Sequence, residues 1–125
     1  MATQDDVRRI ALSLPGAEEA EGRFAFHVVV QDKAKGFVWS WLERVHPKKA
    51  RVPSDTVIAA RTTSVAERDL MISSAPTMFF TEPHYAGYPA VLIRLDAIPI
   101  STLETVIVEA WRCMAPRELR DLVRD

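Results

Sequence analysis

The chain has 125 residues, of which 48% are apolar and 26% are charged. This composition is ordinary for a globular protein, and the length predicts one domain that spans residues 1–125. With one cysteine, Cys113, the chain cannot form an internal disulfide, which fits a reducing compartment. No apolar run approaches the ~20 residues of a membrane helix, and no signal-peptide pattern precedes the domain. We therefore expect a cytoplasmic protein that has no membrane partner.

The net charge of −1 excludes a strongly basic protein, but the charges are distributed unevenly. The segment 1–22 is mainly acidic, whereas the segment 33–51 has six lysine and arginine residues and one carboxylate. A local excess of positive charge can attract a polyanion even when the total charge is near zero. The alternative interpretation is that the basic segment is a solvated turn that binds nothing. The basic residues of this segment are Lys33, Lys35, Arg44, Lys48, Lys49 and Arg51.

The first third of the chain predicts a helix followed by a hairpin. Apolar residues recur at helical spacing over residues 5–14, Thr3 can cap this helix, and a Pro-Gly pair at 15–16 ends it. Residues 23–30 alternate between apolar and polar side chains, which predicts a half-buried strand with Phe24, Phe26, Val28 and Val30 on one face, and Arg23 and His27 on the other. Residues 37–43 form a second, antiparallel strand.

The middle of the chain predicts a loop, a strand and a helix. Two prolines and several basic residues indicate a loop over residues 44–55. Residues 56–63 then form a third strand. Ser64 and Glu67 match a capping box, which begins a helix that ends near residue 74.

The last third of the chain predicts two short strands and two helices. The strands cover residues 78–80 and 90–95. Ser101 and Glu104 form a second capping box before a helix with an apolar stripe, and Pro116 begins a last short helix. The order α-β-β-β-α-β-β-α-α groups the strands together. This grouping predicts an α+β fold with an antiparallel sheet that helices cover on one face.

No pattern in the sequence predicts catalysis or a metal site. The histidines His27, His46 and His84 fall in different elements, and no HxxxH or CxxC spacing occurs. With four glycines, the chain has neither a phosphate-binding loop nor a GxSxG motif. We therefore expect no catalytic residue, no metal and no cofactor, and we interpret the protein as non-enzymatic.

The stretch TEPHYAGYPAVLIRL, residues 81–95, is the strongest argument for an enzyme, because it groups an acid, a base and two phenols: Glu82, His84, Tyr85 and Tyr88. Two prolines that bracket Gly87 are typical of a turn, which explains the segment without a reaction. We predict that the tyrosines pack against the sheet edge and that their hydroxyls reach water or backbone. A deep pocket that joins these side chains to His27 would favour an enzyme.

Strict alternation along the second strand places Phe37, Trp39 and Trp41 on one face. This row could be a platform on which unpaired bases stack, at ~1–3 kcal/mol per base. Large apolar side chains are mostly buried, so we favour the alternative that the row belongs to the core, under the third helix with Trp111. The opposite face, which carries Leu42, then stays partly apolar and could support a dimer.

Three stretches of the chain carry a family resemblance. They are LSLPGAEEAEG at 12–22 leading into FAFHVVV, GFVWSWL at 36–42, and PHYAGYPAVLIRLDAIPISTLETVIVEAWRCMAP at 83–116. These stretches resemble the MmcQ/YjbR-like family of small bacterial proteins, and the resemblance covers essentially the whole chain. It implies an α+β fold like that of secretion chaperones. It also implies DNA binding through a double-wing arrangement, with no catalytic activity and no cofactor.

Two functions follow as alternatives. In the first, the protein binds DNA through phosphate contacts from the hairpin tip and the basic loop, made by Lys33, Lys35, Lys48, Lys49 and Arg51, with Arg44 and Arg61 as weaker candidates. In the second, the chaperone-like fold is a protein-interaction module, whose partner is another protein or a second copy of the chain.

Overall fold

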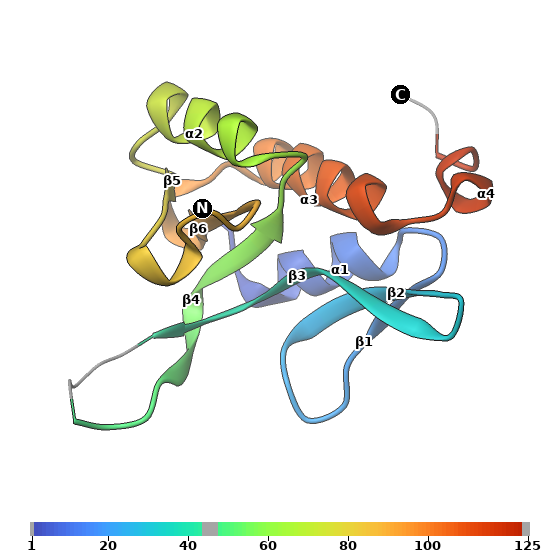
Figure 1. Cartoon of the computed structure of the whole chain (residues 1–125), viewed down its shortest axis with the longest axis horizontal. Coiled ribbons are helices and arrows are strands. Elements are labelled where there is room, and N and C mark those ends of the chain that lie inside the picture. Colours follow the sequence, from blue (N-terminus) through green and yellow to red (C-terminus); the bar gives the residue numbers. More distant parts are fainter. Residues whose placement is uncertain (1, 44–47, 124–125) are drawn as a thin grey trace.

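The computed structural model describes residues 2–43 and 48–123, which form an antiparallel sheet with helices packed on it (Figure 1). The sheet has six strands in the order β1-β2-β3-β4-β6-β5. The strands are β1 (Ala17–Glu19), β2 (Ala25–Val30), β3 (Lys33–Glu43), β4 (Val52–Arg61), β5 (Phe79–Phe80) and β6 (Ala90–Arg94). The helices are α1 (Gln4–Leu12), α2 (Val65–Ser74), α3 (Ile100–Met114) and α4 (Arg117–Arg120). The predicted α+β class with an antiparallel sheet is confirmed.

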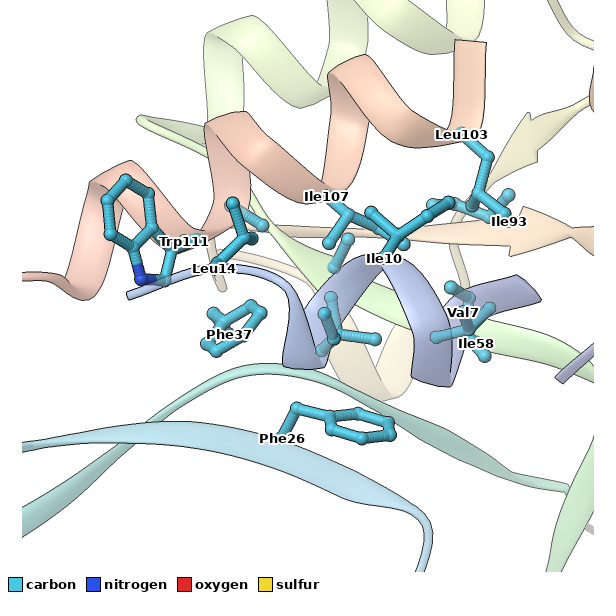
Figure 2. Close-up of a cluster of buried hydrophobic side chains, with 14 of the residues drawn as sticks. Val7, Ile10, Leu14, Phe26, Phe37, Ile58, Ile93, Leu103, Ile107 and Trp111 are labelled. Carbon is cyan, nitrogen blue, oxygen red and sulfur yellow. The ribbon is translucent and has the colours of Figure 1, made fainter. Parts of the chain in front are cut away.

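The hydrophobic core lies between the sheet and the two helices α1 and α3 (Figure 2). Trp111 of α3 is fully buried there, and its indole N–H donates a hydrogen bond to the Pro15 carbonyl oxygen at 3.0 Å. The other labelled core residues are Val7, Ile10, Leu14, Phe26, Phe37, Ile58, Ile93, Leu103 and Ile107. Within the described part of the chain, the helices are all too short or too polar to cross a bilayer.

The helix starts test the capping predictions. At α1, the Thr3 hydroxyl accepts from the backbone N–H of Asp6, whose carboxylate accepts from the N–H of Thr3. At α2, the Ser64 hydroxyl accepts from the N–H of Glu67. Thr3 and Ser64 therefore cap their helices as predicted, and the reciprocal carboxylate bond of a capping box is formed at α1. The prediction for α3 is wrong, because this helix begins at Ile100 behind a proline and has no side-chain cap.

The sheet has one strand more than the sequence predicted. Residues 17–19, which we had placed in an acidic connection, form β1 and pair with β2, so that Glu18 lies opposite His27. A strand of three residues is too short to show an alternating pattern. Strand β3 also begins at Lys33, which is earlier than predicted, because hairpin pairing with β2 extends to the turn.

A β-bulge in β3 decides which side chains enter the core. Phe26 of β2 lies opposite Val38, but the next residue, His27, lies opposite Gly36, so Phe37 is an extra residue in the ladder. A bulge places two successive residues of one strand against one position of its partner. Phe37 and Val38 are accordingly both fully buried in the core.

The bulge changes the alternation along the rest of β3. Trp39 lies opposite Ala59 of β4, which in turn lies opposite Leu92 of β6, and none of these three side chains belongs to the core on the helix side. Trp39 and Trp41 are half-buried on the sheet face that α1 and α3 leave open. The prediction of one core-facing row made by Phe37 and both tryptophans is therefore wrong. We call this second surface the open face.

Candidate functional site

Residues 81–89 fold across the open face and bond to both of its tryptophans. The indole N–H of Trp39 donates to the Tyr85 hydroxyl at 3.2 Å, and the indole N–H of Trp41 donates to the Glu82 carboxylate at 2.8 Å. The segment is a turn, as predicted, with a 3₁₀ helix over Pro83–Tyr85. Each tyrosine hydroxyl accepts a hydrogen bond from a side chain, Trp39 or Arg61, which the sequence did not predict.

Tyr88 joins this cluster to β4. Its hydroxyl accepts a hydrogen bond from Arg61 at 2.7 Å, and the Arg61 guanidinium lies 5.0 Å from the centre of the Tyr88 ring. Trp39 meets the same ring edge-to-face at 6.4 Å between centroids. Burial raises the pKa of the Tyr85 phenol above its ordinary value, so this hydroxyl stays protonated at neutral pH. Tyr85 is therefore a hydrogen-bonding group here and not a base.

A buried arginine holds the turn in place from α2. Arg68 donates to the carbonyl oxygen of Tyr85 at 2.8 Å and to that of Tyr88 at 3.1 Å, and it pairs with Asp69. Sequence reasoning missed this residue. The signal was available, because Arg68 precedes the core-packed Met71 by one helical turn and thus lies on the inward face of α2. A charge on such a face needs buried partners.

Replacing Arg68 with methionine should loosen this turn. Arg68→Met keeps the apolar stem but leaves two carbonyl oxygens without their charged donor, which should lower the free energy of unfolding by about 2–3 kcal/mol. Amide hydrogen exchange at Tyr85 and Tyr88 should also become faster than in the unsubstituted protein, and by more than exchange in the core strands does. Arg9→Met on the exposed side of α1 is the matched control, and its free energy of unfolding, measured in urea, should barely differ from that of the unsubstituted protein. Unaltered exchange at the turn in Arg68→Met would contradict the anchoring role.

Two adjoining hollows lie beside Trp39, one at the edge of the open face where β4 ends and one under the turn that crosses this face. The basic hollow, about 450 Å³, lies at the β3 bulge where β4 ends, and its lining includes Arg23, Phe26, His27, Lys35, Trp39, Arg61, Tyr88 and Met114 of α3. Lys35 lies opposite Val28 of the core, so it enters this lining from the helix side of the sheet, whereas Trp39 belongs to the open face. The aromatic hollow, about 370 Å³, is lined by Arg23, Trp39, Leu42, His84, Tyr85 and Tyr88. Among the described residues, no carboxylate lines either hollow. The two hollows are neighbours, because they share the lining residues Arg23, Trp39 and Tyr88.

The structure does not gather the predicted basic residues into one patch. One group lies at the start of β3 and the other lies beyond its far end. This strand has eleven residues, and at a rise of ~3.3 Å per residue its two ends are roughly 33 Å apart. The first group is Lys33 and Lys35. The second group is Lys48, Lys49 and Arg51, which precede β4 in the chain. The prediction for Arg44 lies outside the described residues. Of these residues, Lys35 lines the basic hollow, together with Arg61.

The Arg51 guanidinium already makes contacts within the protein. It donates to the Leu42 carbonyl oxygen at 2.9 Å and lies 3.5 Å from the Glu82 carboxylate. The same carboxylate accepts from Trp41, so Arg51 and Trp41 share one acceptor. This arrangement fixes the start of β4 against the turn.

The histidines do not converge on an active site in the described part of the chain. His84 is exposed and meets the Tyr85 ring edge-on at 5.6 Å, but the hollow that they line includes neither Glu82 nor His27. His27 instead lies 3.5 Å from Glu18 of β1. No three His, Cys, Asp or Glu side chains among the described residues gather closely enough to hold a metal ion.

Cys113 should react slowly with alkylating reagents. The thiol lies in a partly apolar hollow between α2 and α3, and burial raises its pKa above the ordinary value. Since the thiolate is the nucleophile, iodoacetamide should modify the folded protein at neutral pH more slowly than the chain unfolded in guanidinium chloride. Mass spectrometry measures both rates. Equal rates in the two states would contradict the burial of this thiol.

These features define a small α+β protein whose antiparallel sheet is covered by helices on one face and carries aromatic and basic residues on the other. The chain is 35% identical over 120 residues to the uncharacterized proteins Rv2570 and MT2646 of Mycobacterium tuberculosis and Mb2600 of Mycobacterium bovis, which covers 95% of this chain and 93% of each relative. The chain belongs to the family of these mycobacterial proteins.

The fold also occurs in a protein of low sequence identity. The crystal structure of Deinococcus radiodurans protein DR2400, with the family-model domain DUF419, matches at a TM-score of 0.71 and 14% identity, over 98% of this chain and 88% of that chain. At this identity the match shows the fold alone. No family model matches the chain.

Proposed function

We propose that this protein binds DNA, without catalysing a reaction, through the open face of its sheet. The observation that carries the proposal is the basic hollow, whose described lining includes three cations, Arg23, Lys35 and Arg61, together with Trp39 and no carboxylate. Cations without a competing carboxylate attract phosphate, and an aromatic ring beside them suits a base. The resemblance to the MmcQ/YjbR-like family, whose members are described as DNA-binding, supports the same function.

Two groups of lysines lie toward the two ends of β3, and the first group lies opposite Val28 and Val30, at the edge of the sheet's helix side. A polynucleotide that lies along the strand would meet Lys33 and Lys35 at one end, and Lys48 and Lys49 at the other. These side chains are exposed, and lysines of this kind contact phosphates without selecting a base sequence. Arg51 would have to exchange its contacts with Glu82 and the Leu42 carbonyl oxygen for a phosphate contact.

Fluorescence anisotropy with a labelled oligodeoxynucleotide, titrated over a series of salt concentrations, tests the proposal. We expect low-micromolar binding at low salt and a logarithm of the association constant that falls linearly with the logarithm of salt concentration. For about four phosphate contacts the slope should be roughly −3 to −4. Absence of binding at low micromolar protein and low salt would contradict the proposal, and so would an affinity that salt leaves unchanged.

A protein-interaction module has less support from the described residues. Large apolar side chains are exposed, but they belong to different elements of the fold, which does not by itself make the contiguous patch that such a module needs. They are Leu12, Val29, Leu42, Val52, Leu70, Tyr88, Ile100 and Leu122.

A further inference from the structure

We propose that the two hollows form one site for unpaired nucleotides, so that the protein prefers single-stranded to duplex nucleic acid. This inference rests on the proposed function and names the class of nucleic acid that the open face takes. The hollows have volumes of about 450 and 370 Å³, and each falls within the ~300–1,000 Å³ range of small-ligand sites. Since they share Arg23, Trp39 and Tyr88, neighbouring units of one strand could occupy both.

The aromatic hollow has the chemistry that an unpaired base requires. Four of its six lining side chains are planar rings, namely Trp39, His84, Tyr85 and Tyr88. A base in a duplex is stacked between its neighbours, so its faces are not available to a protein ring, whereas an unpaired base offers both faces. The hollow thus offers a duplex little beyond the phosphate contacts, but it offers a single strand additional stacking.

The protein holds these rings in place before a ligand arrives. Trp39 is hydrogen-bonded to Tyr85, the Tyr85 and Tyr88 rings lie 6.2 Å apart, and Arg68 fixes the backbone carbonyls of both tyrosines. Binding therefore costs little side-chain ordering. The indole N–H of Trp39 is already bonded within the protein, so contact with the ring face is the remaining mode, and such contact tolerates any base.

The basic hollow provides the phosphate contact beside the rings. The Arg61 guanidinium lies over the Tyr88 ring and bonds to its hydroxyl, which fixes one cation at the boundary between the hollows. Arg23 lines both hollows and Lys35 lines the basic one. A nucleotide carries a flat ring and an anion at adjacent positions, as this pairing requires, whereas an acidic peptide supplies the anion alone.

Three probes separate stacking from charge. They are a twelve-residue oligodeoxythymidylate, an abasic twelve-residue strand with the same phosphates, and a twelve-base-pair duplex, each measured by anisotropy at one low salt concentration. We expect the thymidylate to bind about tenfold or more tightly than the abasic strand, which corresponds to about one base stack. We also expect it to bind more tightly than the duplex, and polyglutamate to compete poorly.

Two variants locate the effect. His84→Ala and Tyr88→Leu should each lower the affinity for thymidylate several-fold and leave the abasic strand unchanged. His84 is exposed and bonds to no core residue, so its variant should fold even if the loss of Tyr88 loosens the turn.

The outcomes separate this inference from the proposed function. If the duplex and the abasic strand bind as tightly as thymidylate, the inference fails and DNA binding stands. If no probe binds, both fail. Displacement of thymidylate by polyglutamate at a similar concentration also overturns the inference, because charge alone would then explain the binding.

Discussion

Reversing the charges of Arg23 and Lys35 together is expected to weaken oligodeoxynucleotide binding on the order of 100-fold at low salt, about tenfold for each contact. Both side chains are exposed and both line the basic hollow. The double variant Arg23→Glu with Lys35→Glu therefore replaces two phosphate ligands with two repelling carboxylates but leaves the core intact. The dependence of the association constant on salt concentration should also become shallower, by the amount expected for about two lost phosphate contacts. Anisotropy measures both quantities, and circular dichroism confirms that the variant is folded.

A matched pair of substitutions on other elements controls for net charge. Arg9 of α1 and Arg117 of α4 have side chains that are 59% and 83% exposed, and neither lines the two hollows. Arg9→Glu with Arg117→Glu changes the net charge by the same amount. It should weaken binding by less than about threefold, because salt screens distant surface charges. An equal loss in both double variants would mean that overall charge drives binding and that the open face is not the site.

Truncating Trp111 to alanine should destabilise the fold by about 3–5 kcal/mol. The indole is fully buried between α3 and the sheet, beside Leu14 and Phe37, and its removal leaves a cavity (Figure 2). The loss also removes the donor to the Pro15 carbonyl, which joins α3 to the end of α1. Since small proteins are stable by about 5–15 kcal/mol, this one change should cost a large part of the total. Urea unfolding measures the loss.

Trp111→Phe separates the two contributions. Phenylalanine fills much of the volume but donates no hydrogen bond, so the cost should be smaller than for alanine and include about 1 kcal/mol for the lost bond to Pro15. The contrasting site is Trp39, which is half-buried on the open face and outside the core. If Trp111→Ala were no more destabilising than Trp39→Ala, the assignment of the two faces would be incorrect.

The elements that could be predicted from the sequence are those set by local chemistry. Thr3 and Ser64 cap α1 and α2 because a hydroxyl beside unpaired N–H groups is favourable in any context. The alternation of residues 23–30 likewise placed Arg23 and His27 together on the polar face, and both line the basic hollow. These predictions needed no knowledge of neighbouring strands.

The errors arise where pairing between strands overrides local pattern. Counting alternate residues along β3 assumes a regular ladder, and one extra residue at Phe37 was enough to put both tryptophans on the opposite face. The same irregularity creates the candidate site, because it brings Trp39 toward the turn that carries Tyr85. Neither residue indicates this contact from its own sequence neighbourhood, since 46 positions separate them.

Which basic side chains lie close together could not be predicted from the sequence either. Six basic residues within a short segment suggested one patch, but an extended strand separates its two ends, whereas Arg23 and Arg61 come together across three strands. Arg61 appeared only as a weaker candidate, and Arg23 only as part of a polar strand face. Strand order and register, which a single sequence does not provide, decide these distances.

The most direct test of binding at the open face uses the protein's own tryptophans. Biosynthetic 5-fluorotryptophan gives one fluorine resonance for each of Trp39, Trp41 and Trp111, and single substitutions to phenylalanine assign them. On addition of oligodeoxythymidylate, we predict that the Trp39 resonance shifts with ligand concentration and that the resonance of Trp111, buried on the other side of the sheet, stays in place. A Trp39 resonance that does not move while anisotropy reports saturation would contradict the account.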